Sequence, residues 1–134
     1  MRRYLLDSNT AADFVAKRGA VPDRARETRL RGGKIGIGVP VLAELYYGFE
    51  YSSSRDLNLR KLGHALGELR VWPFDVAAAA EFGRLRAEMR RRGRSTQIID
   101  FMIAAIALTL GNCTVVTSDS DLSAIPGLAV ENWR

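Results

Sequence analysis

The residues Tyr4-Leu5-Leu6-Asp7-Ser8-Asn9 set the pattern for the whole chain. The three apolar residues predict a short buried strand, and the acid that follows them stands at its carboxyl end. Ser8 and Asn9 are residue types that favour the N-terminus of a helix, so a helix is expected from about residue 10 to residue 18. A strand that leads directly into a helix is the basic unit of α/β proteins.

The same alternation continues to the C-terminus. Further strands are predicted at residues 34–39, 71–72, 113–117 and 128–130, and further helices at residues 22–31, 40–51, 55–69, 76–92 and 98–110. This pattern indicates a three-layer α/β/α fold around a central, mostly parallel sheet of four or five strands. Because no long polar linker interrupts the chain, a single domain over residues 1–134 is expected.

Composition excludes several classes of protein. Apolar residues make up 47% and charged residues 26%, a mixture typical of globular domains rather than disordered ones. The longest apolar stretch, residues 101–110, is half of the roughly 20 residues that a membrane span needs. No signal peptide is recognisable, and a single cysteine excludes an internal disulfide. A cytoplasmic protein without a membrane partner is therefore expected.

The positive charge is clustered. The net charge is +5, and basic residues concentrate in residues 24–34, 55–61 and 84–94. Basic clusters favour binding to the phosphates of a nucleic acid. Arginines on exposed helix faces that only keep the domain in solution explain the same pattern equally well, so both interpretations stay open.

Four acids lie in apolar surroundings: Asp7, Glu44, Asp100 and Asp119. A carboxylate buried among apolar residues is costly unless something compensates its charge. Simpler explanations exist for some of them. Asp119 is equally well placed to cap a short turn, and Asp7 is placed to cap a helix, although Ser8 and Asn9 can fill that role. Glu44 can also be explained as a solvated residue of its helix. Asp100 is the hardest to explain structurally, since Asp is a mediocre residue inside a buried helix.

Convergence of the four acids would create a metal site. Two carboxylates about 4 Å apart repel each other by roughly 4 kcal/mol at an effective dielectric of 20. Such a cluster holds either protons or cations, and Mg²⁺ and Mn²⁺ prefer carboxylate and water ligands. Paired divalent ions are a known device for phosphodiester hydrolysis, with basic residues holding the substrate backbone.

Four motifs in this order resemble those of PIN-domain ribonucleases, and among them the VapC-type toxins of type II toxin–antitoxin pairs. The first motif is residues 4–9, quoted above. The others are Val41-Leu42-Ala43-Glu44-Leu45-Tyr46-Tyr47-Gly48, Ile99-Asp100-Phe101-Met102-Ile103-Ala104-Ala105-Ile106-Ala107 and Val116-Thr117-Ser118-Asp119, followed by Ile125-Pro126-Gly127-Leu128 and Glu131-Asn132-Trp133. The resemblance covers essentially the whole chain and implies a PIN-like fold.

The resemblance also implies a function. It makes Asp7, Glu44 and Asp100 ligands of Mg²⁺ or Mn²⁺, with Asp119 as the fourth acid. Relatives often carry that acid slightly later, so Asp121 is the alternative. Ser8 and Thr117 match positions that support the acids through hydrogen bonds. The resemblance further implies that the protein hydrolyses RNA, often transfer RNA. It also implies that the protein forms a homodimer and is neutralised by a cognate antitoxin.

Two rival functions remain. Asp7 followed by Thr10 is similar to the opening motif of haloacid-dehalogenase-like phosphotransferases, but Asn9 stands where that chemistry needs a second acid. The other rival is a non-catalytic PIN-like RNA-binding module. The presence of all four acids argues against lost activity. A phosphatase assay separates the first rival from a nuclease, and a cleavage assay separates the second.

Overall fold

The computed structural model describes residues 1–134 and contains a five-stranded, entirely parallel sheet in the order β3-β2-β1-β4-β5. The strands are β1 (Arg3–Leu6), β2 (Lys34–Gly38), β3 (Arg70–Trp72), β4 (Cys113–Val116) and β5 (Ala129–Glu131). All five predicted strands are present, and the expectation of a mostly parallel sheet is confirmed.

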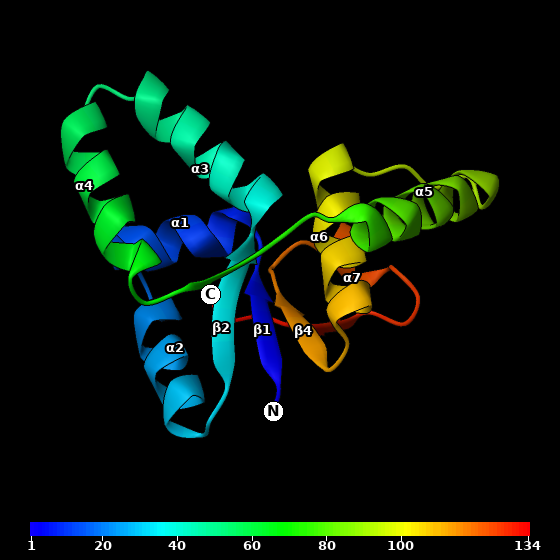
Figure 1. Ribbon diagram of the computed structural model, residues 1–134, viewed down its shortest axis with the longest axis horizontal. Helices are drawn as coiled ribbons and strands as arrows, with labels where there is room; N and C mark the ends of the chain where they lie inside the picture. Colours follow the sequence, from blue (N-terminus) through cyan, green and yellow to red (C-terminus); the bar gives the residue numbers. More distant parts are fainter.

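Seven helices connect the strands: α1 (Ser8–Ala16), α2 (Val21–Leu30), α3 (Val39–Tyr51), α4 (Arg55–Leu66), α5 (Val76–Arg91), α6 (Ile98–Leu110) and α7 (Ser120–Ser123). Figure 1 shows α1 to α4 grouped on one side of the strands and α5 to α7 on the other, which confirms the three-layer arrangement. Only the short helix α7 was not predicted, because four residues are too few to show a helical period. No helix is long and apolar enough to cross a membrane.

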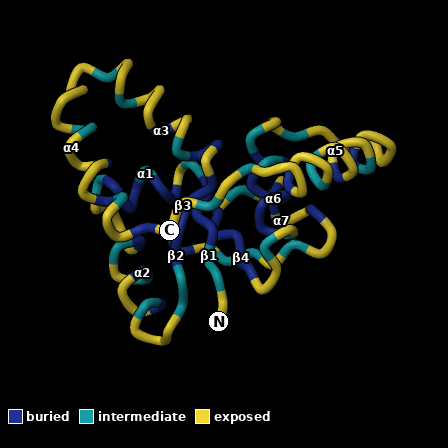
Figure 2. Tube along the Cα trace, in the orientation of Figure 1, coloured by how far each residue is buried: buried dark blue, intermediate teal, exposed yellow.

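The core lies where the central strands meet the inner helices. Leu5 and Leu6 of β1 are fully buried, as are Val115 and Val116 of β4. Helix α6 is apolar on nearly all sides and is buried over most of its length, as expected for a helix enclosed by its neighbours. Figure 2 shows this burial around the strands and α6, while α3, α4 and α5 remain largely exposed.

The strand register brings distant motifs to one edge of the sheet. Leu6, the last residue of β1, pairs with Val116, the last residue of β4. Because the two strands are parallel, the residues that follow them emerge side by side. Ligands of open parallel sheets bind at this edge. The first and last of the four motifs therefore meet here.

A glycine lies where the end of β2 meets α6. A Cβ atom added to Gly38 would lie 2.6 Å from Ile106 Cδ1 in α6. A larger residue at this position would therefore require the end of the Ile106 side chain to move, next to the start of α3.

Candidate active site

Asp7 is held rigidly where β1 ends and α1 begins. Its Oδ1 accepts a hydrogen bond from the backbone N–H of Thr10 at 2.9 Å, and its Oδ2 accepts one from the Thr117 hydroxyl at 2.5 Å. The residue is only 5% exposed, and no Lys or Arg pairs with it. The carboxylate is thus buried and oriented, yet its charge is not neutralised by the protein.

Asp7 itself is the N-cap of α1, which corrects the expectation that Ser8 or Asn9 fills this role. Its backbone is extended, with φ −75° and ψ 177°, so the side chain can turn back to Thr10. The Ser8 hydroxyl is buried without a hydrogen-bond partner, so it does not make the supporting bond that the resemblance implied. Thr117 does make such a bond.

Asp100 lies in the first turn of α6 and is 8% exposed. Burial raises the pKa of its carboxyl to about 6, and the negative charges of Asp119 and Asp7 act in the same direction. The hydroxyl of Thr96 donates to Asp100 Oδ2 at 3.2 Å and partly opposes this rise. Asp100 therefore shares an electrostatic neighbourhood with two other acids, although more than 90 residues separate it from Asp7 in the chain.

Asp119 lies next to this pair and is half-buried. It caps α7, because its Oδ1 accepts from the N–H of Asp121 at 2.9 Å. The interpretation of Asp119 as the cap of a short turn is thus correct. Asp119 also lies beside Asp100, so the two interpretations do not exclude each other. The N–H of Asp119 also donates to Thr117 Oγ1 at 2.9 Å, so a single threonine is bonded to two of the acids.

Asp121 is exposed and lies at the edge of the site. Its Oδ2 is 3.4 Å from the Thr96 hydroxyl, the same hydroxyl that donates to Asp100. Thr96 is a residue that the sequence did not single out. The only feature of the sequence that could have indicated its role is a hydroxyl side chain four positions before Asp100, in a loop without any other recognisable pattern.

Glu44 differs from Asp7, Asp100 and Asp119 in its exposure. It is exposed on α3, and it makes no hydrogen bond or ion pair. No group of three or more Asp, Glu, His or Cys side chains is arranged to hold a metal ion. Asp7, Asp100 and Asp119 thus lie close enough for their charges to act on Asp100, whereas the exposed Glu44 is not among the charges that raise its pKa.

The donor chemistry of the three neighbours fits a hard divalent cation. Mg²⁺ is typically bound by one or two carboxylates and completes its shell with waters and substrate phosphates, so three protein ligands are not needed. Asp7 and Asp100 are buried carboxylates without a basic partner. The buried hydroxyls of Ser8 and Thr10, next to Asp7, also lack partners. Unsatisfied polar atoms of this kind are typical of a site that binds a further polar group.

Comparison with known families settles the class of domain. The family described as PIN domain matches residues 4–128. The chain belongs to the PIN domain family. Asp7, Glu44, Asp100, Asp119 and Asp121 all lie within the matched range of this PIN domain.

Relatives and solved structures share the full length of this PIN domain. It is 32% identical over 134 residues to a protein of Shigella flexneri named tRNA(fMet)-specific endonuclease VapC, covering 99% of each chain. Among solved structures, DNA-bound VapBC from Salmonella typhimurium has a TM-score of 0.90 at 31% identity, with full coverage of both chains. VapBC2 from Rickettsia felis, bound to a promoter DNA fragment, also has a TM-score of 0.90, at 30% identity over 98% of this chain and 99% of that one.

The arginine-rich helix of the PIN domain supports the solvated-face interpretation. Arg84 pairs with Glu81, and Arg91 and Arg92 both pair with Glu88, all on the exposed surface of α5. Such pairs between residues three or four apart are ordinary features of a solvent-exposed helix. Three of the six arginines in residues 84–94, the cluster considered for phosphate binding, are thus already paired with nearby acids.

Proposed function

We propose that this chain, as a single PIN domain over residues 1–134, is a divalent-metal-dependent endoribonuclease and the toxin half of a toxin–antitoxin pair. The observation that carries the proposal is the burial of Asp7 and Asp100 beside Asp119, without a basic partner, at the edge of the sheet where β1 and β4 end. Clustered carboxylates of this kind suit a cation rather than a covalent nucleophile. The family match favours this activity over the haloacid-dehalogenase-like alternative.

In this proposal Asp7, Asp100 and Asp119 hold Mg²⁺ or Mn²⁺. Glu44 contributes from α3 at the edge of the site, and Asp121 is the alternative to Asp119. The bound ion supplies the positive charge that phosphodiester hydrolysis requires at the attacking and leaving oxygens. Thr117 fixes the orientation of Asp7, and Thr96 orients Asp100. Burial and the neighbouring carboxylates raise the pKa of Asp100 to about 6, and a bound cation would offset the unfavourable burial and repulsion that cause this rise.

The substrate and partners are inferred from the relatives. The Shigella flexneri relative is named for tRNA(fMet), which supports a transfer RNA or another structured RNA as substrate. The Salmonella typhimurium and Rickettsia felis structures are of VapBC complexes, which supports a cognate antitoxin that neutralises this chain. We also propose that the protein is a homodimer and acts in the cytoplasm.

The test is cleavage of tRNA(fMet) by the purified protein. Cleavage is expected with Mg²⁺ or Mn²⁺, and EDTA is expected to abolish it. Asp100→Asn removes the buried charge with little change in shape and should abolish cleavage while the protein remains folded. Asp56→Asn is the matched control, because Asp56 is an exposed acid that pairs only with Arg55. Metal-independent cleavage, or an Asp100→Asn protein that cuts at the wild-type rate, would refute the proposal.

A further inference from the structure

A small pocket lies beside the acidic site, where the end of α5, the loop after it, α6 and α7 meet. Its volume is about 300 Å³. Met89 of α5 and Phe101 of α6 line it and are almost fully buried, so they form an apolar floor. Arg94, Thr96 and Asp121 supply its polar groups. These residues make up the Arg94 pocket, which has the usual composition of a small-ligand site, an apolar surface with a few polar groups.

Thr96 connects the Arg94 pocket directly to the acids. Its hydroxyl lies 3.2 Å from Asp100 Oδ2 and 3.4 Å from Asp121 Oδ2, and both Thr96 and Asp121 line the pocket. Asp100 also precedes Phe101 of the pocket floor in the chain. A ligand that fills the Arg94 pocket therefore contacts Thr96, one hydrogen bond away from Asp100.

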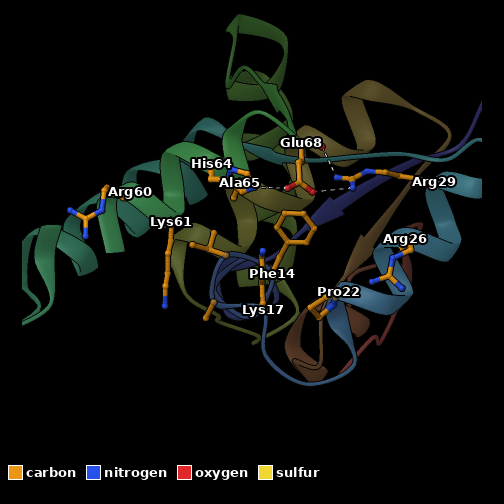
Figure 3. Close-up of a pocket in the computed structure, with 12 residues that line it drawn as sticks. Phe14, Lys17, Pro22, Arg26, Arg29, Arg60, Lys61, His64, Ala65 and Glu68 are labelled. Atoms are coloured by element: carbon orange, nitrogen blue, oxygen red, sulfur yellow. Dashed lines mark hydrogen bonds and ion pairs between the residues drawn. The ribbon is translucent and has the colours of Figure 1, made fainter. Parts of the chain in front are cut away.

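Figure 3 shows a larger cavity, of about 610 Å³, that lacks this connection. It lies between α1, α2 and α4, and the acid that lines it is Glu68, which pairs with Arg29 at 3.4 Å. None of the four candidate acids lines that cavity. Contact with the acidic site therefore distinguishes the Arg94 pocket from the larger cavity.

Arg94 is an arginine that no other side chain engages. Of the six arginines in residues 84–94, three pair with glutamates and one lies over an aromatic ring; these four are Arg84, Arg91, Arg92 and Arg86. The side chains of Arg90 and Arg94 make no hydrogen bond or ion pair. Of these two, only Arg94 lines the pocket. The guanidinium beside the acids is therefore the one that remains available for a ligand.

The end of α5 fixes the backbone of Arg94. The N–H of Arg94 donates to the carbonyl oxygen of Met89 at 2.9 Å, and the N–H of Gly93 donates to that of Arg90 at 3.0 Å. Gly93 has φ 71°, the left-handed conformation that this type of helix ending requires. Because its backbone is already ordered, Arg94 loses less freedom when its guanidinium donates two parallel hydrogen bonds to a phosphate.

We propose that the Arg94 pocket binds the RNA nucleotide next to the cleaved bond, with a phosphate on the Arg94 guanidinium and the base against Met89 and Phe101. The proposal rests on the proposed ribonuclease function and adds a substrate contact to it. A volume of about 300 Å³ is at the lower limit of the roughly 300–1,000 Å³ of small-ligand sites, which suits one nucleotide. Bases stack on aromatic and apolar side chains where the strand is unpaired, so the RNA is single-stranded at this point.

The mixed charge of the Arg94 pocket favours a nucleotide over a free anion. Asp121 repels a bare anion, whereas a base presents amino groups from which a carboxylate accepts hydrogen bonds. Arg94 attracts the phosphate of the same ligand. A nucleotide carries both kinds of group, and the link through Thr96 places it at the bond to be cleaved.

The first test measures the affinity of Arg94→Ala for tRNA(fMet) by fluorescence anisotropy in EDTA, which prevents cleavage. We expect a loss of about tenfold and a slope of log affinity against log salt that is smaller by about 0.7, because one phosphate contact is removed. Arg94→Lys keeps the charge without the two parallel hydrogen bonds, so it should restore the slope but only part of the affinity. The melting temperature should not change, since the Arg94 side chain is exposed and unpaired.

Arg90→Ala is the matched control. Arg90 is an equally exposed and unpaired arginine of α5, but it does not line the pocket, so its loss should leave the affinity close to that of the wild-type protein. Equal losses in the two alanine variants would mean that net charge determines binding, and would overturn the proposal. Wild-type affinity in Arg94→Ala would overturn it as well.

The second test probes the base. The cleaved bond is mapped from the ends of the products, and RNAs are made in which the nucleotide on one or the other side of this bond lacks its base. The wild-type protein should cleave one of them about tenfold more slowly at low substrate concentration. Ala124→Leu fills the pocket, because Ala124 is an exposed residue that lines it. This variant should cleave the intact RNA about as slowly, and the missing base should then have no further effect.

The second test also separates this proposal from the proposed function. If the wild-type protein cleaves no RNA, the proposed function fails. If it cleaves the intact RNA, but a missing base slows the wild-type and Ala124→Leu proteins by the same factor, the base does not occupy the Arg94 pocket. In that case only the role of the pocket is overturned.

Discussion

Thr117 donates its hydroxyl to Asp7 Oδ2 at 2.5 Å, although 110 residues separate the two in the chain. The same hydroxyl oxygen accepts from the N–H of Asp119 at 2.9 Å. One buried side chain thus fixes the relative positions of the acids at the ends of β1 and β4. The bond exists because these two strands are parallel neighbours whose last residues pair with each other.

Replacement of Thr117 by valine should disturb both acids without changing the volume of the side chain. Loss of a buried donor is expected to lower the free energy of unfolding by roughly 1–2 kcal/mol. The proposed cleavage of tRNA(fMet) should slow by about 10- to 100-fold, because Asp7 loses the bond that orients it. Chemical denaturation and cleavage kinetics measure the two effects. Thr117→Ser, which keeps the hydroxyl, should restore most of the rate, and an unimpaired valine variant would contradict this role.

The metal-free protein should become more stable as the pH falls from 7 towards 5. The folded-state pKa of Asp100 is about 6, above its ordinary value of 3.8, so the folded protein binds a proton more tightly than the unfolded chain between these values. Above pH 6 the buried charge of Asp100 lowers the free energy of unfolding by its full amount, at most about 3 kcal/mol. This loss of stability disappears as the pH falls and the carboxylate takes up a proton.

Thermal unfolding in EDTA checks this pH dependence. Asp100→Asn has no charge to bury, so it should be more stable than the wild-type protein at pH 7, and the two melting temperatures should converge towards pH 5. Comparison of the two proteins cancels the titration of the remaining carboxylates. A constant difference between them across this range would show that Asp100 does not titrate there.

Much of this architecture could be predicted from local sequence. Apolar runs such as residues 4–6 and 113–117 contain enough information to locate the strands, because a buried strand of a parallel sheet is apolar on both faces. The helix boundaries were less certain. Helix α1 ends at Ala16, two residues before the expected residue 18, because Lys17 adopts the left-handed conformation.

The arrangement of the acids was only partly predictable. Asp7 and Asp119 follow strands, so their meeting at one edge of the sheet follows from the topology. The exposure of Glu44 agrees with the interpretation of this acid as a solvated helix residue, which the sequence alone left open. Asp100 is close to the other acids for a non-local reason, because β3 to β4 is a long crossover connection that contains α5 and α6.

Cys113 should be unreactive in the folded protein. Burial raises the pKa of its thiol to about 11, above the ordinary value of 9.0. At pH 8 this leaves about one thiolate in a thousand, against about one in ten in the unfolded chain, so alkylation by iodoacetamide should be about 100-fold slower in the native state. Mass spectrometry with and without denaturant measures the two rates. Equal rates would show that the start of β4 opens readily.

Gly38→Ala should crowd the contact between the end of β2 and α6. The backbone of Gly38 has φ −82° and ψ 156°, which alanine adopts without strain, so the only obstacle is the contact with Ile106 Cδ1. Overpacking of this kind typically costs about 1–3 kcal/mol. Denaturant unfolding should show this loss.

Removing the Cδ1 methyl group of Ile106 tests whether the contact with this group is what destabilises the Gly38→Ala protein. Ile106→Val deletes Cδ1 and should by itself cost about 0.5–1.5 kcal/mol, because it leaves a small cavity. Combined with Gly38→Ala, however, it should recover stability, since the new methyl group fills the space that the old one leaves. The two substitutions should therefore be less destabilising together than their sum. Additive losses would mean that the two positions do not compete for the same space.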